Sequence, residues 1–232
     1  MACRLKLIIF SIFAEAPDLT IGQFATDRGP CAKWQRCVAH SVHGDAGVFD
    51  RFAWAYDRVM PPADADALRA GLARAERDLE LVVDVGGGSG RASRAITAPN
   101  QLVVDAARGM LDQATRHGLA VVQGDAATLP IGDERADAIV IVDAFHHLPD
   151  RSGAITAAAR ALAPGGVLVV ADFDPTTIRG RGLVLAERLV GFDSRFDTPI
   201  QLRDRMADAG LTPRTVEDGF GYVVAGVRPT DG

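Results

Sequence analysis

From residue 64 onward, segments with continuous apolar residues alternate with segments in which apolar residues recur every three or four positions. Continuous runs of Val, Ile and Leu predict strands that are covered on both faces. These runs span residues 79–86, 101–106, 120–126, 137–144 and 165–174. Apolar residues three or four positions apart predict helices that begin at Asp64 and Gly90 and that span 107–117 and 152–163. The alternation predicts an α/β fold with a doubly wound, mostly parallel sheet.

In the last third of the chain, turn residues and helix caps predict the elements more clearly than the spacing of apolar residues does. Pro164–Gly166 is expected to end the preceding helix, and a further helix is predicted over 176–192. Thr198 and Gln201 have capping-box spacing around Pro199, so a helix should run from there to about residue 209. Residues 212–229 resemble a closing antiparallel hairpin.

Composition divides the chain near residue 40. Every lysine and cysteine precedes that point: Lys6, Lys33, Cys3, Cys31 and Cys37. We therefore interpret residues 41–232 as one domain, and residues 1–40 as either a disordered extension or the result of a mis-assigned start. The apolar run near the N-terminus is short for an export signal, and no stretch is long enough to span a membrane. We expect a cytoplasmic protein, with peripheral membrane contact only if its substrate is a lipid.

The net charge of −5 provides no basic surface for nucleic acid, so we expect no nucleic-acid partner. The sequence leaves the oligomeric state open. With no cysteine after residue 40, a disulfide framework in the domain is excluded.

A glycine-rich loop follows the first predicted strand, in the sequence VVDVGGGSG. Gly86, Gly88 and Gly90 permit a tight turn and a close approach of a ligand to the backbone, at the start of a helix. A P-loop would need a lysine here, and the domain contains none. The dinucleotide fingerprint fails because Arg91 occupies the position of its third glycine.

Acidic residues occupy the ends of four successive predicted strands, namely Asp84, Asp105, Asp125 and Asp143. Such a row suits a ligand with positive charge and does not suit a pyrophosphate. Asp105 could accept hydrogen bonds from the ribose hydroxyls of an adenosine group, or it could cap the next helix. The residues leave that choice open.

Together these segments resemble class I S-adenosylmethionine-dependent methyltransferases of the type 11 domain. More specifically, they resemble the branch that includes the ubiquinone and menaquinone biosynthesis enzymes. The resemblance rests on VVDVGGGSG, VVDAARGML, GDAATLPIGDERADAIVIVDAFHHLPD and ARALAPGGVLVVADF. It implies a seven-stranded sheet with a terminal antiparallel hairpin, and S-adenosylmethionine as cofactor. The implied cofactor contacts are Asp84, Gly86, Gly88, Ser89, Gly90, Asp105, Ala106, Met110, Asp125, Ala126 and Asp143.

The resemblance also implies a small-molecule methyl acceptor, with a prenylated quinone precursor as one candidate. The segment DAFHHLPD departs from the quinone enzymes proper, which leaves the acceptor open. His146 or His147 could act as a base, or both could shape the pocket. We expect no metal, because the sequence shows no third ligand beside them. An aromatic segment, residues 49–56, is expected either to pack in the core or to cover the cleft.

Two other functions compete with this one. An NAD-dependent oxidoreductase is disfavoured by Arg91 and by the acids after the third and fourth strands. A non-catalytic module that only binds the cofactor would show the same motifs.

Overall fold

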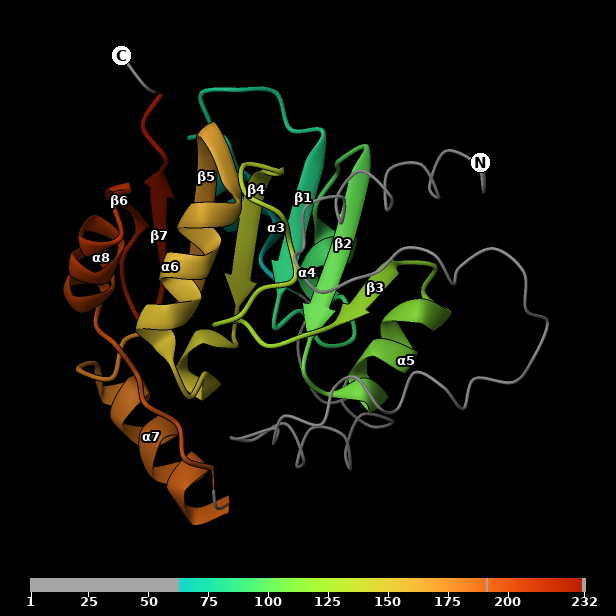
Figure 1. Cartoon of the computed structure of the whole chain (residues 1–232). Coiled ribbons are helices and arrows are strands. Elements are labelled where there is room, and N and C mark those ends of the chain that lie inside the picture. Colours follow the sequence, from blue (N-terminus) through green and yellow to red (C-terminus); the bar gives the residue numbers. More distant parts are fainter. Residues whose placement is uncertain (1–62, 191, 231–232) are drawn as a thin grey trace.

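The structure is a computed structural model of the chain, and it describes residues 63–190 and 192–230. The expectations for residues 1–40 and for the aromatic segment 49–56 lie outside the described residues. Within the described part, seven strands form one sheet in the order β3-β2-β1-β4-β5-β7-β6 (Figure 1). The first five strands in this order run parallel, and β7 is antiparallel to both of its neighbours. The predicted fold class is confirmed.

The strands are β1 (Leu81–Val85), β2 (Asn100–Asp105), β3 (Ala120–Gln123), β4 (Ala136–Val142), β5 (Leu162–Phe173), β6 (Thr212–Glu217) and β7 (Gly221–Val227). The helices are α3 (Ala65–Leu72), α4 (Arg91–Ala95), α5 (Arg108–Arg116), α6 (Arg151–Ala161), α7 (Ile178–Val190) and α8 (Pro199–Asp208), with a short 3₁₀ turn, η3 (Phe145–His147). Because β3 ends at Gln123 and β4 at Val142, Asp125 and Asp143 lie just beyond their strands.

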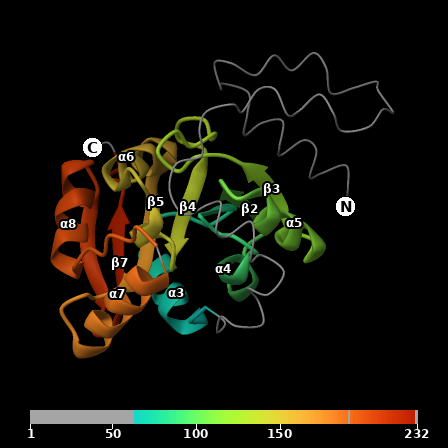
Figure 2. The same ribbon diagram turned by 90° about the horizontal axis from the view of Figure 1, so that it is seen from below.

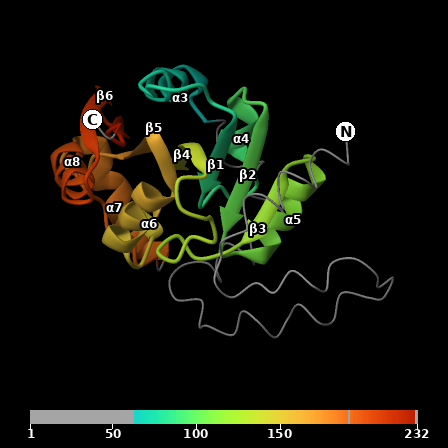
Figure 3. The ribbon, with the colours of Figure 1, turned by 45° about the horizontal axis from the view of Figure 1, so that its top comes forward.

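Two apolar cores cover the two faces of the sheet. Successive residues of a strand point to opposite faces, so Val83 packs in the core under α6 and α8, whereas Val82 packs in the core under α3. Helix α5 covers Val103 on the same face as α3. Figures 2 and 3 show α3 and α6 on opposite sides of the sheet. The continuous apolar runs are explained by this double coverage.

The start of β5 differs from the prediction. Helix α6 ends at Ala161, and β5 begins at Leu162, before the Pro164–Gly166 segment that was expected to end the helix. Leu162 pairs with Ala136, and the register then shifts before Val167 pairs with Ala138. Gly165 has φ of +77°, a conformation that glycine adopts without strain. The Pro-Gly-Gly segment therefore makes an irregularity inside the strand rather than a stop before it.

Both predicted helix caps are confirmed. The Asp64 side chain accepts from the backbone N–H groups of Asp66 and Ala67. Thr198 and Gln201 form the reciprocal capping box, with Pro199 at the first helical position. No helix in the described ranges combines the length and the apolar character needed to cross a bilayer.

Candidate active site

A cavity opens at the carboxyl edge of β1, β2 and β4, and its lining within residues 63–190 and 192–230 falls between Asp84 and Pro149. In Figure 1 the arrowheads of these strands mark that edge at the lower side of the sheet. The strand order reverses between β1 and β4, the position where open α/β sheets bind ligands. The lining includes nine residues named from the sequence: Asp84, Gly86, Gly88, Asp105, Ala106, Met110, Asp125, Ala126 and Asp143.

The glycine loop is shaped by close approaches that a side chain would block. Gly88 has φ of +55°, and a Cβ at this position would lie 2.7 Å from Cε of Met110. The Gly88 N–H donates to Oδ2 of Asp105 at 2.8 Å, so the loop is tied to the end of β2. The loop therefore leaves the cavity open where any other residue would narrow it.

Asp84 is the most deeply buried acid of the cavity wall, with 1% of its surface exposed. Its Oδ2 accepts from the backbone N–H of Ser93 at 3.1 Å and from the Ser93 hydroxyl at 2.7 Å. Its Oδ1 has no hydrogen-bond partner among the described residues. Burial raises the pKa of Asp84 to about 6, against the opposing effect of the Ser93 hydrogen bonds. A positively charged group in the cavity would stabilise the ionised carboxylate.

Asp105 and Asp125 hold the turns that follow their strands. Asp105 Oδ1 accepts from the N–H of Ala107 at 2.7 Å, and Asp125 Oδ1 accepts from the N–H of Ala127 at 2.7 Å. The N-cap of α5 is Ala107, which makes no side-chain cap, so Asp105 is not that cap. Its carboxylate instead braces the glycine loop and faces the cavity.

Asp143 is paired with Arg91, a residue that the sequence analysis treated only as a defect in a glycine fingerprint. Arg91 Nη2 lies 2.9 Å from Oδ2 of Asp143, and both side chains line the cavity. Asp143 has φ of +52°, which is rare for a residue other than glycine. The negative charge of Asp143 is therefore balanced by the positive charge of Arg91, which reduces the total negative charge of the four acids.

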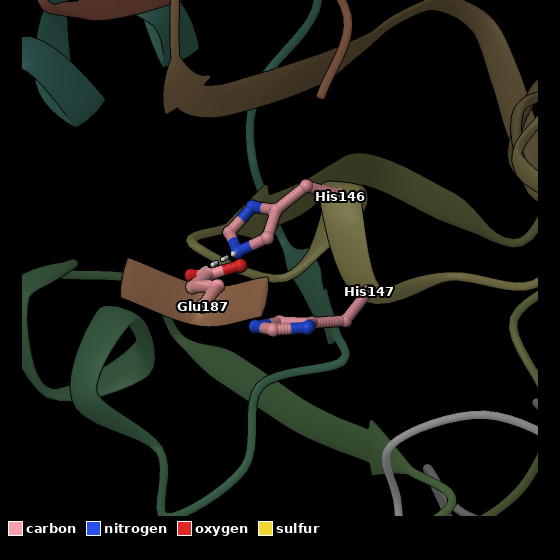
Figure 4. A group of neighbouring side chains, drawn as sticks. All are labelled: His146, His147 and Glu187. Atoms are coloured by element: carbon pink, nitrogen blue, oxygen red, sulfur yellow. Dashed lines mark ion pairs between the residues drawn. The ribbon is translucent and has the colours of Figure 1, made fainter. Parts of the chain in front are cut away.

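The two histidines have different surroundings. His147 lines the cavity, and its Nδ1 lies 3.2 Å from the Ser194 hydroxyl. His146 is 2% exposed and does not line the cavity; its ring stacks on Phe196 with centroids 4.3 Å apart. Figure 4 shows His146 facing Glu187 of α7, with His147 beside both.

Two carboxylates flank the His146 ring. Nδ1 lies 2.6 Å from Oδ1 of Asp172, at the end of β5, and Nε2 lies 3.6 Å from Oε1 of Glu187. Burial alone would lower the pKa of His146, but Asp172 and Glu187 outweigh it and raise the pKa to about 9. Burial likewise opposes ionisation of Glu187, yet His146 holds the pKa of that carboxyl below its ordinary value. Neither carboxylate was recognised from the sequence.

Comparison with known proteins gives a consistent family. Residues 83–170 match the model of the methyltransferase domain family. The chain is 34% identical over 112 residues to a malonyl-[acyl-carrier protein] O-methyltransferase of Xylella fastidiosa, covering 44% of this chain and 38% of that protein. It is 33% identical over 146 residues to a demethylmenaquinone methyltransferase of Beutenbergia cavernae, covering 56% and 58%. The chain thus spans less than two thirds of these relatives.

A solved structure agrees in fold. An S-adenosylmethionine-dependent methyltransferase from Thermotoga maritima superposes with a TM-score of 0.67 at 23% identity, over 78% of this chain and 98% of that one. Over residues 83–170, this chain is therefore similar to the methyltransferase domain family. The residues that this family model matches include β2 and β4 in full and β1 from Val83 onward.

S-adenosylmethionine is the cofactor that this similarity implies, and the cavity fits it on two observations. The cofactor has a sulfonium and an ammonium group, and the buried Oδ1 of Asp84 lacks a partner among the described residues. The backbone at Gly88 leaves space that a Cβ would fill. Asp84 and the glycine loop would hold the amino acid part, and Asp105 would hold the ribose.

Two predicted contacts of the methyltransferase domain lie outside the cavity lining. Ser89 is fully buried, and Gly90 is the N-cap of α4 with φ of +81°. The left-handed backbone at Gly90 favours glycine, and a Cβ there would lie 2.1 Å from Cδ1 of Leu119, which would have to move. Both residues therefore shape the turn without being part of the cavity lining.

Proposed function

We propose that this protein transfers a methyl group from S-adenosylmethionine to a small-molecule acceptor. The observation that supports this most directly is the buried Oδ1 of Asp84, which has no hydrogen-bond partner in the part of the chain that the structure describes and belongs to the wall of a cavity at the strand-order reversal. A pyrophosphate would be repelled there, whereas a cationic cofactor would be attracted.

The bound cofactor would supply a methyl group that is already activated for in-line displacement. The chain's own contribution is then alignment and exclusion of water. The glycine loop and Asp105 fix one end of the cavity, and the segment Ala144–Pro149 forms its other wall. The acceptor would enter along this second wall, because the first is used by the cofactor.

A proton acceptor is needed only if the nucleophile must lose a proton. Of the two histidines proposed for this role, His147 lines the cavity and His146 does not. His147 is therefore the better placed of the two to take a proton from the acceptor.

We further propose a prenylated quinol as the first acceptor to test. One relative is named a demethylmenaquinone methyltransferase. In addition, α7 exposes apolar side chains beyond the carboxyl edge, with Ile178 90%, Leu185 59% and Leu189 80% exposed. Such a helix would favour contact with a membrane surface or with an isoprenoid tail.

Thermal unfolding with added ligands tests the cofactor and separates the alternatives. A ligand at about 100 times its Kd stabilises the native state by roughly 2.7 kcal/mol, which is a shift of about 5–10 °C for a domain of this size. We expect this shift with S-adenosylhomocysteine and none with NAD. A shift with NAD alone would favour the oxidoreductase.

Methyl transfer is then measured by mass spectrometry with a demethylated menaquinol and with a hydrophilic phenol of similar acidity. Methylation of the quinol alone supports the finer proposal. Cofactor binding without methylation of any acceptor in a broad panel would favour the non-catalytic module.

A further inference from the structure

We propose that His146, His147 and Glu187 form a binding site for a first-row transition-metal ion of the zinc class, next to the cavity. One potential ligand atom from each residue lies within 4.8 Å of the other two. Two imidazole nitrogens and one carboxylate oxygen are a ligand set typical of catalytic zinc, which leaves a further coordination position open.

The spacing of His146 and Glu187 fits shared ligation. Their Nε2 and Oε1 atoms lie 3.6 Å apart, which is longer than the 2.7–2.9 Å or so of a charge-assisted hydrogen bond. Ligands about 2.0–2.1 Å from one tetrahedral ion lie roughly 3.4 Å from each other. The separation is therefore closer to that of two ligands of one ion than to that of a direct bond.

The partner of His146 on its other nitrogen strengthens this assignment. Asp172 Oδ1 lies 2.6 Å from Nδ1, and Oδ2 accepts from the His146 backbone N–H at 3.0 Å. A carboxylate bound to the distal nitrogen fixes the tautomer and orients the ring, as it does behind metal-binding histidines in general. With Nδ1 held in this way, Nε2 faces Glu187 (Figure 4).

Charge and unsatisfied hydrogen-bonding capacity also favour a cation. Asp172 and Glu187 place two carboxylates around a ring that is 2% exposed. No described donor reaches Oε2 of Glu187 in hydrogen-bonding geometry, although this atom is buried. A proton on His146 would satisfy Oε1 alone, whereas a metal ion would engage both His147 and the Glu187 carboxylate.

The site adjoins the cavity through His147, which belongs to both. A metal ion held there would be able to bind a hydroxyl oxygen of the acceptor and lower its pKa, so that the acceptor would release its proton to solvent and reach the methyl group as an alkoxide or phenolate. The metal-bound His147 would then act as a ligand, and the metal ion would replace the need for it as a base. This use of the ion rests on the proposed function, whereas binding of the ion does not.

The test uses the full chain with Cys3, Cys31 and Cys37 replaced by serine, because these thiols could bind metal elsewhere. After treatment with a chelator, the protein is titrated with Co²⁺ followed by visible absorption, and with Zn²⁺ followed by calorimetry. No cofactor or acceptor is present, so the result is independent of methyl transfer.

We expect one equivalent of Co²⁺ with the visible bands of a four- or five-coordinate ion, displaced by Zn²⁺. Glu187→Gln and His147→Gln should each weaken binding by about 100-fold or more, and Asp172→Asn by about 10–100-fold. His117→Gln, at the far end of α5, is the matched control and should bind as the parent does. Circular dichroism checks that each variant is folded.

Two results would overturn the proposal. One is a folded parent that binds no Co²⁺ or Zn²⁺, in which case His146 is a buried imidazolium between two carboxylates. The other is unchanged affinity in both Glu187→Gln and His147→Gln, which would place any bound ion elsewhere. If the parent protein binds the metal ion but transfers no methyl group to any acceptor, that result would instead contradict the proposed function alone.

Discussion

Arg91 and Asp143 form an ion pair across the mouth of the glycine loop, with Nη2 and Oδ2 separated by 2.9 Å. The arginine side chain is 8% exposed and the aspartate 21%. Removing one partner of such a pair leaves a charge in a poorly solvated place. We expect Arg91→Leu to lower the free energy of unfolding by about 3 kcal/mol.

Urea denaturation measures this effect, and Arg91→Lys is the control because it keeps the charge. We expect Arg91→Lys to recover part of the loss, since lysine lacks the planar fork of arginine. Equal stability of Arg91→Leu and the parent would show that the pair contributes nothing measurable.

Gly88 and Gly118 allow steric blocking of the cavity to be separated from backbone strain. Both have positive φ, +55° and +80°, but only at Gly88 does a Cβ meet a neighbour, Met110. Each substitution to alanine should cost about 1–2 kcal/mol of stability from the backbone. Only Gly88→Ala should also weaken S-adenosylhomocysteine binding, by about tenfold or more, because Met110 would be pushed into the cavity.

Isothermal titration at a temperature where both variants are folded tests this expectation. Equal loss of affinity in Gly118→Ala, where nothing lies within 4 Å of the added Cβ, would mean that loop strain rather than contact with Met110 controls binding.

Asp84 should stabilise the folded protein at low pH and lose this contribution as the pH rises. A carboxylate in an ion pair behaves in the opposite way. The pKa of Asp84 is raised to about 6 from 3.8, so the folded state binds the proton more tightly than the unfolded state does. This contribution is present below pH 4 and is lost as the pH rises towards 6 and beyond. The whole shift corresponds to about 3 kcal/mol.

Asp84→Asn lacks this titration and still offers an oxygen to Ser93. Relative to the parent, its unfolding free energy should therefore rise by about 2 kcal/mol between pH 4 and pH 7. Chemical denaturation at several pH values without cofactor gives this difference. Parallel pH profiles for the two proteins would contradict an elevated pKa at this position.

The same aspartate should make cofactor affinity rise with pH. The ionised carboxylate attracts a cationic ligand, whereas the protonated form does not. We expect S-adenosylhomocysteine to bind more tightly at pH 7 than at pH 5, and the dependence to be reduced in Asp84→Asn. Binding that is equally strong at both pH values would remove Asp84 from the ligand's charged end.

Asp197 joins the start of α8 to α6. It pairs with Arg151, and its Oδ2 lies 2.6 Å from Nε of Arg205, while its own side chain is 4% exposed. Asp197→Ala should cost about 3–5 kcal/mol, because two arginines lose a buried partner. Asp193→Ala, four residues earlier and 84% exposed, should change stability by less than about 1 kcal/mol. Comparable losses in the two variants would contradict the difference in burial.

The sheet and the cofactor side of the site were predictable because their signals are local. Strand β1 is fully buried and apolar except for Asp84, and Gly86, Gly88 and Gly90 after it have positive φ, as a tight glycine turn requires. Asp64 and Thr198 identify helix starts by their own hydrogen bonds. Each of these features depends on residues within a few positions of one another.

The surroundings of the histidines were not predictable, because they depend on contacts distant in sequence. Asp172 meets His146 from the end of β5, and Glu187 meets it from α7. No spacing in the sequence links these three positions. Arg91 is similar, since its partner Asp143 follows β4, which the chain reaches only after β2 and β3. The helix before Pro164–Gly166 ends as expected, but the earlier start of β5 was not predictable, because Leu162 pairs with Ala136 of β4, a residue distant in sequence.

Among the described residues, those that line the cavity all belong to one continuous stretch of chain, Asp84–Pro149. The residues that would hold the cofactor can therefore be left unchanged while a segment that follows β5 is replaced. A chimera that exchanges residues 174–198 for the corresponding segment of a related enzyme should keep its cofactor affinity while acquiring a different choice of acceptor. Such an arrangement would allow the same cofactor-binding residues to serve many substrates, with changes confined to the segment 174–198.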